Sequence, residues 1–122
     1  MKQVIGLFEE GKVQKLFGMF VGSDMSFKDD YSYLNENFED YKKLENELPK
    51  SSILAYMESL TPCCLAPMIS HDIFSKEVIP NPGFYEDGIF IFLTDFLYYF
   101  KNYEIGIPYE YENFLKTKIH SK

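Results

Sequence analysis

Few polar side chains in this chain are spaced in a way that could do chemistry. His71 is followed directly by Asp72, and this is the only polar pair that could do acid–base work near the end of a strand. Neighbouring residues on an extended chain point to opposite sides, so these two do not form a dyad by themselves. We therefore expect His71 and Asp72 to lie in a turn between two strands.

The two cysteines, Cys63 and Cys64, are also adjacent. Neighbouring cysteines rarely bond to each other, and a cysteine nucleophile needs an activating base beside it. A zinc site needs further Cys or His ligands, for which the chain offers only His71 and His120. We expect both cysteines to be small buried strand residues, and we expect no metal and no other cofactor.

Carboxylates are plentiful, with 19 Asp and Glu residues. A glycosidase pair or a metal-carboxylate site could lie among them, but no spacing singles out such a pair. The glycine-rich phosphate loops and the nucleophile elbow of hydrolases are also missing from the sequence. The sequence therefore predicts a protein that is not an enzyme. A small enzyme with a carboxylate site is kept as a further alternative to the hypotheses given below.

The charge balance excludes two classes of partner. The chain has a formal net charge of −7, and all 12 of its cationic side chains are lysines. An acidic chain without a basic cluster repels nucleic-acid phosphates and anionic membrane surfaces. We expect neither as a partner. Glu9 and Glu10 interrupt the first apolar run too early for a signal peptide, so the cytoplasm is the expected compartment.

The acidity is concentrated in two segments that also contain several tyrosines. Residues 24–47 hold eight acids and three lysines, which is net −5, and residues 84–112 hold six acids and one lysine, which is again net −5. Carboxylates steer association with a basic protein, and Tyr supplies rigid contact area. The first segment provides the preferred binding residues, namely Asp29, Asp30, Tyr31, Tyr33, Glu36, Glu39 and Asp40. The second provides Glu86, Asp87, Glu110 and Glu112.

The elements that position these residues are expected to form one α+β domain over residues 1–122. The spacing of Val13, Leu16, Phe17 and Phe20 favours a helix over about 12–21, although residues 9–12 could equally form a hairpin turn. A polar loop over 23–36 follows. Asn37 should cap a helix that ends before Pro49, and a second helix should span about 51–60.

The second half of the chain reads first as strands. Short apolar runs at 63–69, 73–79 and 89–93 predict a three-stranded antiparallel meander, on which the helices pack. Thr94 and Asp95 should start a helix over about 95–104, and Pro108 should open the last one. The aromatic stretch 85–108 cannot be a membrane span, because Asp87 and Asp95 bound a short apolar run and a span needs about 20 apolar residues.

The stretch from residue 85 to residue 115 resembles the ending of small bacterial immunity proteins. These proteins belong to contact-dependent growth inhibition and polymorphic toxin systems. The matching positions are Asp87-Gly88, Ile89 to Phe92, Asp95-Phe96-Leu97, Tyr98-Tyr99, Tyr103, Pro108 and Phe114, with Phe92 where the family usually has Trp. The first 48 residues match no family pattern.

The resemblance implies toxin neutralisation by direct binding, without catalysis and without a cofactor. It agrees with the charge, because a nuclease toxin that acts in the cytoplasm has a basic cleft that an acidic inhibitor can fill. We therefore expect a cytoplasmic immunity protein whose partner is a basic cognate toxin domain, with a nuclease as the expected class. An acidic regulatory or adaptor domain that binds another basic protein is the alternative.

Overall fold

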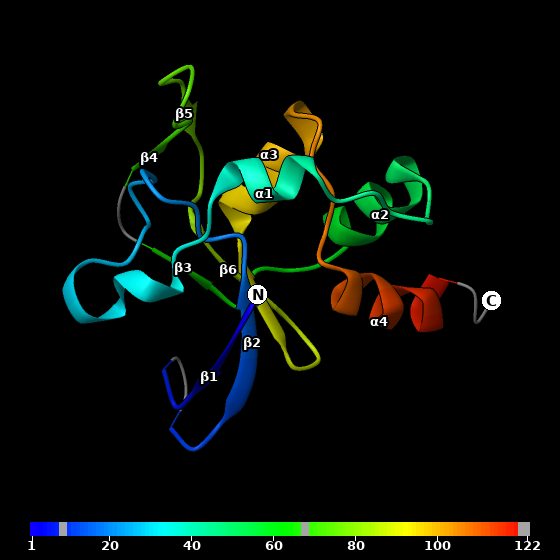
Figure 1. Cartoon of the computed structure of the whole chain (residues 1–122), viewed down its shortest axis with the longest axis horizontal. Coiled ribbons are helices and arrows are strands. Elements are labelled where there is room, and N and C mark those ends of the chain that lie inside the picture. The colour runs from blue at the N-terminus through cyan, green and yellow to red at the C-terminus, as the bar shows by residue number, and fades with distance from the viewer. Residues whose placement is uncertain (8–9, 67–68, 120–122) are drawn as a thin grey trace.

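Two strands from opposite ends of the sequence lie side by side at the centre of the fold. In the computed structural model, which describes residues 1–7, 10–66 and 69–119, β2 (Val13–Phe17) pairs in parallel with β7 (Phe90–Leu93), so that Lys15 lies opposite Phe90. Figure 1 shows β2 low in the view, with α1 and α3 above it. The pairing joins the first segment of the chain to its most aromatic one.

The central pair is extended on both sides into a mixed five-stranded sheet. Its order is β1-β2-β7-β6-β3, and every neighbouring pair except β2 and β7 is antiparallel. The added strands are β1 (Lys2–Ile5), β6 (Gly83–Asp87) and β3 (Cys64–Leu65). A separate two-stranded hairpin pairs β4 (Ser70–His71) with β5 (Val78–Ile79).

The expected α+β class is confirmed at this level, but the three-stranded meander is not confirmed. The apolar runs at 63–69 and 73–79 contribute only two-residue strands, β3 and β5, which lie in different sheets. The reason is local. His71 pairs with Val78, and the backbone N–H of Asp72 donates to the carbonyl of Glu77. The segment 71–78 therefore forms a hairpin of its own and does not join the five-stranded sheet.

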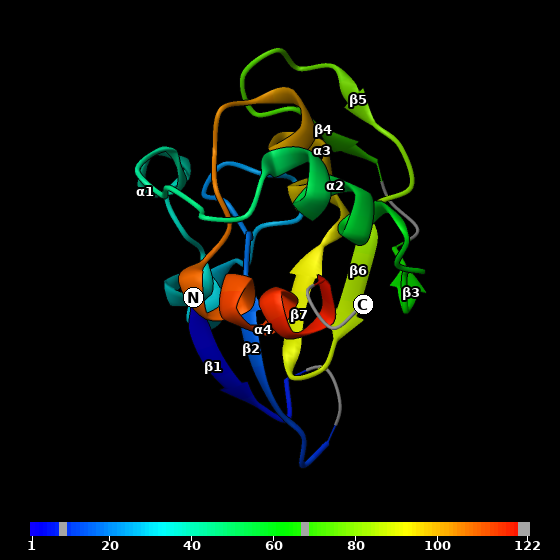
Figure 2. The ribbon, with the colours of Figure 1, turned by 90° about the vertical axis from the view of Figure 1, so that its right-hand side faces the viewer.

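The four α-helices pack on one face of the five-stranded sheet (Figure 2), where Phe17, Phe92, Phe96 and Tyr111 form a fully buried aromatic core. Phe17 lies 4.9 Å from Phe92 and 5.1 Å from Phe96 between ring centroids. The opposite face carries a smaller cluster around Val4, Leu16, Leu34 and Ile91. The helices are η1, a 3₁₀ helix (Asp29–Leu34), α1 (Phe38–Lys42), α2 (Lys50–Glu58), α3 (Thr94–Asn102) and α4 (Tyr109–Ile119).

The helix expected over 12–21 is wrong, because this segment contains strand β2. Gly11 and Gly18 have φ angles of +75° and +82°, which suit turns at the two ends of a strand and do not fit a helix. The alternative hairpin is the observed arrangement, since β1 and β2 are antiparallel and the N–H of Gly6 donates to Lys12. Glu9, in the predicted turn at 9–12, lies outside the described residues.

The helix predicted from Asn37 begins where expected but ends early, at Lys42. The following residues are held by the C-terminal part of the chain instead of by helical bonds. The buried carboxylate of Glu112 accepts from the N–H of Leu48 and from the side chain of Asn46, which also donates to the carbonyl of Ile107. These bonds to a distant segment replace the last helical turns.

The helices predicted over 51–60, over 95–104 and after Pro108 are all present, as α2, α3 and α4. Gly88, at a φ angle of +63°, makes the turn between β6 and β7. In the described part of the chain, none of the helices combines the length and the apolar character that crossing a membrane would require.

Candidate functional site

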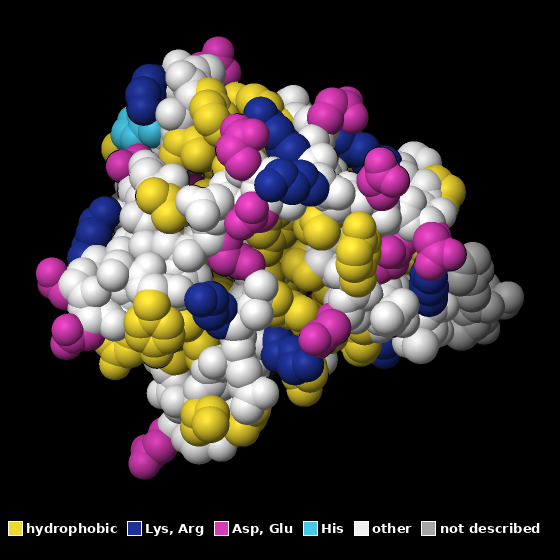
Figure 3. Space-filling view, in the orientation of Figure 1, with side chains coloured by type: hydrophobic (Ala, Val, Ile, Leu, Met, Phe, Trp, Pro, Cys, Tyr) yellow, Lys and Arg dark blue, Asp and Glu magenta, His cyan; other side chains and the backbone are white. Residues whose placement is uncertain are grey.

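The two acidic segments of the sequence meet at one surface pocket of about 420 Å³, which we call the acidic pocket. Figure 3 shows an apolar hollow near the middle of this face, with acidic side chains at its rim. The first segment supplies residues from the end of the η1 loop through α1, and the second supplies the residues that open α4. The lining residues are Met1, Glu36, Asp40, Tyr41, Leu44, Pro108, Tyr109 and Glu110.

Asp40 and Glu110 are the exposed carboxylates of this pocket. They are 70 positions apart in the sequence, in the first turns of α1 and α4 respectively. Glu110 forms an ion pair with Lys15, whereas the carboxylate of Asp40 makes no ion pair with any described residue. Both charges therefore face solvent above the apolar surfaces of Leu44 and Pro108.

Glu36 lines the same pocket, but its carboxylate is used within the fold. It accepts from the Met1 amine at 2.7 Å, from the N–H of Gly18 at 2.8 Å and from the Tyr41 hydroxyl at 2.7 Å, and its side chain is only 13% exposed. Burial, followed by the nearby Glu36 charge, raises the pKa of Tyr41, so its hydroxyl stays protonated and donates. Glu36 thus shapes the pocket and leaves the charge on its rim to Asp40 and Glu110.

The rest of the first predicted set remains at the surface but away from this pocket. Glu39 is exposed and pairs with Lys42 at 3.1 Å on α1. The other members, Asp29, Asp30, Tyr31 and Tyr33, belong to η1. Tyr31 and Tyr33 are 50% and 63% exposed and line a separate open groove beside β1, which we call the edge groove.

Three carboxylates of the second predicted set accept hydrogen bonds within the fold. Of these, Glu112 is buried, which corrects its expected place on a binding surface, whereas Asp87 is half-buried and Glu86 stays exposed. Glu112 is 3% exposed and holds the 46–48 segment as described above. Asp87 accepts from the hydroxyls of Tyr56 and Tyr111, at 3.0 and 2.9 Å. Glu86 accepts from Lys12 and Gln14 across the sheet, at 2.8 and 2.6 Å. Of this set, only Glu110 lines the acidic pocket.

The sequence does not indicate the apolar part of the acidic pocket. Tyr41 and Leu44 have the spacing of an inward helix face, and nothing marks them as pocket residues. Tyr109 sits just after Pro108 and accepts from the N–H of Glu45 at 3.1 Å, which ties α4 to the segment that follows α1. This contact depends on the tertiary fold, so no local pattern could have indicated it.

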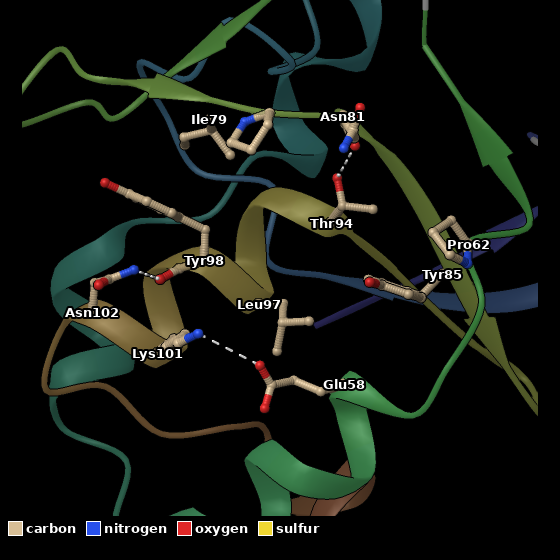
Figure 4. Close-up of a pocket in the computed structure, with 11 residues that line it drawn as sticks. Glu58, Pro62, Ile79, Asn81, Tyr85, Thr94, Leu97, Tyr98, Lys101 and Asn102 are labelled. Carbon is tan, nitrogen blue, oxygen red and sulfur yellow. Dashed lines mark hydrogen bonds and ion pairs between the residues drawn. The ribbon is translucent and has the colours of Figure 1, made fainter.

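A second pocket, of about 440 Å³, lies between α2, α3 and the start of β6 (Figure 4). Tyr85, Leu97 and Tyr98 contribute apolar surface, and Figure 4 shows Glu58 on α2 facing Lys101 on α3, with 3.6 Å between the charged groups. Glu58 is the one carboxylate among the described residues that line it. A glycosidase needs a pair of carboxyl groups across its site, so this pocket does not supply that chemistry.

His71 and Asp72 diverge, as expected for neighbours on an extended chain. His71 Nδ1 lies 2.8 Å from the carboxylate of Asp24 at the surface. Asp72 is 1% exposed and accepts from the hydroxyls of Tyr98 and Tyr103. Burial alone would raise the pKa of Asp72, but hydrogen bonds from Tyr103, from two backbone N–H groups and from Tyr98 together lower it. Asp72 is thus an ionised anchor for the β4–β5 hairpin.

Cys63 and Cys64 are exposed, so the expectation that they are buried is wrong. Only the N–H of Cys63 and the short strand β3 tie them to β6, which leaves both side chains at a sheet edge. Partial burial of the sulfur and then the adjacent thiol raise the pKa of Cys63 to about 11, so this thiol stays protonated at neutral pH. The second histidine considered as a ligand, His120, lies outside the described residues, among which no group of three potential ligands gathers.

Comparisons with protein-family models, with curated proteins and with solved structures gave no match to this chain. The resemblance of residues 85–115 to immunity proteins therefore stays a prediction.

Proposed function

We propose that this protein is an immunity protein that binds a basic cognate toxin domain, a nuclease, and blocks its substrate cleft. The observation that carries the proposal is the meeting of Asp40 and Glu110 over an apolar hollow, from segments 70 positions apart. A long basic side chain carries an apolar stem and a charged head. The hollow suits the stem, and the two rim carboxylates suit the head.

Neutralisation follows from competition for the same positive charges. A nuclease holds phosphates with Lys and Arg, and an acidic protein that docks on those residues keeps nucleic acid out. The net charge of −7 adds long-range attraction to a basic partner, which speeds the encounter. In this proposal the protein acts in the cytoplasm, where the toxin would reach nucleic acid.

The experiment mixes the purified protein with the toxin domain encoded immediately upstream of its gene. We expect a one-to-one complex by size exclusion at micromolar concentration, and loss of nuclease activity at equimolar ratio. The double variant Asp40→Asn, Glu110→Gln should weaken both. The matched control Glu58→Gln, Glu77→Gln removes the same number of charges at exposed positions outside the acidic pocket and should weaken neither.

The proposal fails if no complex forms with the upstream domain. Capture of a different basic protein, encoded in a metabolic or phage operon, would instead favour the regulatory or adaptor domain.

A further inference from the structure

Among the described residues, no strand pairs with the outer edge of β1. The sheet order places β1 at one end, where β2 is its single neighbour in the described residues. Hydrogen-bonded pairs alternate along an antiparallel ladder. The N–H of Gly6 donates to the carbonyl of Lys12 across the β1–β2 pair. By alternation, Val4 and Lys2 also form hydrogen-bonded pairs with β2, whereas Gln3 and Ile5 do not. The N–H and C=O groups of Gln3 and Ile5 therefore point away from β2.

The edge groove runs beside this open edge. It has a volume of about 270 Å³, and its lining residues are Gln3, Val4, Ile5, Gly6, Leu7, Tyr31, Tyr33 and Leu34. Its wall is η1, whose two tyrosines are half exposed or more, and Ile5 is 69% exposed. Free main-chain groups beside a groove that can take side chains are the two features that strand addition uses, one for affinity and the other for specificity.

The opposite edge of the sheet is shorter. β3, the edge strand there, has only two residues, so it offers few outward main-chain groups. Short edge strands are a common way in which proteins limit pairing with other chains. The β1 edge is twice as long and has a groove beside it.

We propose that an extended segment of the basic partner adds to β1 as a sixth strand, with one of its apolar side chains in the edge groove. This inference rests on the proposed function and specifies the binding mode. Asp29 and Asp30 are exposed at the start of η1, and the acidic pocket begins at Met1, directly before β1. A basic strand therefore finds carboxylates on η1 and in the acidic pocket.

Charge also separates this occupant from a second copy of the chain. Pairing β1 with β1 of another copy would bring together two proteins of net charge −7 each, which repel at physiological ionic strength. A cationic strand gains from the same charges. The occupant is therefore the partner and not a second copy.

The first test uses a probe that does not depend on identifying the toxin. The probe is an eight-residue peptide of alternating Val and Lys, blocked at both ends, and the readout is the amide NMR spectrum of the ¹⁵N-labelled protein. We expect concentration-dependent shifts at Gln3 to Ile5 and at Tyr31 and Tyr33. The same peptide with N-methyl groups on the edge-facing amides should bind at least tenfold more weakly. Shifts confined to the acidic pocket, or equal binding of both peptides, would overturn the proposal.

The second test changes the edge itself. In Ile5→Pro the lost N–H faces outward, so the ladder to β2 is kept while pairing on the edge is blocked. Ile5→Thr is the matched control, because it removes apolar surface and keeps the N–H. We expect Ile5→Pro, confirmed as folded by circular dichroism, to bind the peptide and the upstream toxin domain at least tenfold more weakly than Ile5→Thr.

The outcomes separate the two proposals. A toxin complex that forms equally well with Ile5→Pro refutes strand addition and leaves the proposed function standing. Peptide binding at the edge without any toxin complex refutes the proposed function and supports the open edge as a docking surface.

Discussion

Replacing Asp72 tests the polar network that fixes the β4–β5 hairpin to α3. Its carboxylate accepts four hydrogen bonds, from the hydroxyls of Tyr98 and Tyr103 at 2.8 and 2.6 Å and from the N–H groups of Phe74 and Ser75 at 2.7 and 3.1 Å. Asp72→Asn keeps the shape. Its amide oxygen can still accept from the backbone, and the two hydroxyls can rotate to accept from its NH₂ group.

The magnitude follows from the bond types. A hydrogen bond to a charged group contributes about 1.5–3 kcal/mol and a neutral one about 0.5–1.5 kcal/mol, so four bonds lose about 4 kcal/mol of gross energy in the Asn variant. Relief of the buried charge and the partial exposure of both tyrosines offset about half of this. We expect Asp72→Asn to lower the free energy of unfolding by about 1–2 kcal/mol, and Asp72→Ala by about 3–4 kcal/mol.

The pH dependence has a defined sign. The pKa of Asp72 in the folded protein lies below its ordinary value of 3.8. The stability that Asp72 contributes is therefore fully present above pH 3.8 and is lost as the pH falls through the folded pKa. The difference between the wild type and Asp72→Asn should shrink as the pH falls below about 4.

The assay is urea unfolding followed by far-ultraviolet circular dichroism between pH 7 and pH 3, with Glu77→Gln on the same hairpin as the control. Equal stability of Asp72→Asn and the wild type at pH 7 would refute the account of the network. So would a difference that stays constant down to pH 3.

Three further substitutions test other parts of the fold. Burial raises the pKa of Asp95, so the stability that Asp95 contributes is fully present below pH 3.8 and is lost as the pH rises through the folded pKa. In urea unfolding, the stability of Asp95→Asn relative to the wild type should therefore increase between pH 4 and pH 7. A constant difference would contradict this. Gly18→Ala should lower the free energy of unfolding by about 3 kcal/mol or more, because φ is +82° and the new Cβ would lie 2.9 Å from Cβ of Phe96. The control is Gly11→Ala, whose new Cβ meets nothing within 4 Å. If Gly18→Ala lowers the thermal midpoint less than Gly11→Ala does, this reasoning is wrong. Glu112→Ala should cost about 2–4 kcal/mol and speed amide exchange at Leu48, whose N–H loses its acceptor; unchanged exchange at Leu48 would place the anchor elsewhere.

Elements with strong local signals were predictable from the sequence. The β6–β7 turn has an Asp-Gly step, and β7 is an apolar run of β-forming residues. Helix α3 begins at Thr94 and α4 begins at Tyr109, directly after Pro108, close to the two expected helix starts. Each of these signals lies within a few residues, so no knowledge of distant contacts was needed.

The β2 strand was not predictable in this way. Gln14 is a polar residue at a 1% exposed position of β2, which hides the alternation that would mark a strand. The strand is defined by its parallel pairing with β7, 75 positions away at Lys15 and Phe90, and a sequence pattern cannot indicate such a partner.

The candidate site was predictable only in part, because carboxylates have the same appearance in a sequence whatever they do. Asp40 and Glu110 are exposed at the acidic pocket, and the charge pattern indicated both. Glu36, Asp87 and Glu112 belong to the same acidic segments, yet they accept hydrogen bonds within the fold. Only their partners in space distinguish the two groups.

The association rate constant of this protein with the upstream-encoded domain, measured by stopped flow at 20 mM and 500 mM NaCl, tests the central claim most directly. At low salt, Asp40→Lys together with Glu110→Lys should slow association about tenfold or more relative to the control Glu58→Lys with Glu77→Lys, which changes the net charge equally at exposed positions outside the acidic pocket, and the difference should largely vanish at high salt. If the two double variants associate at the same rate in low salt, the acidic pocket does not bind a basic toxin.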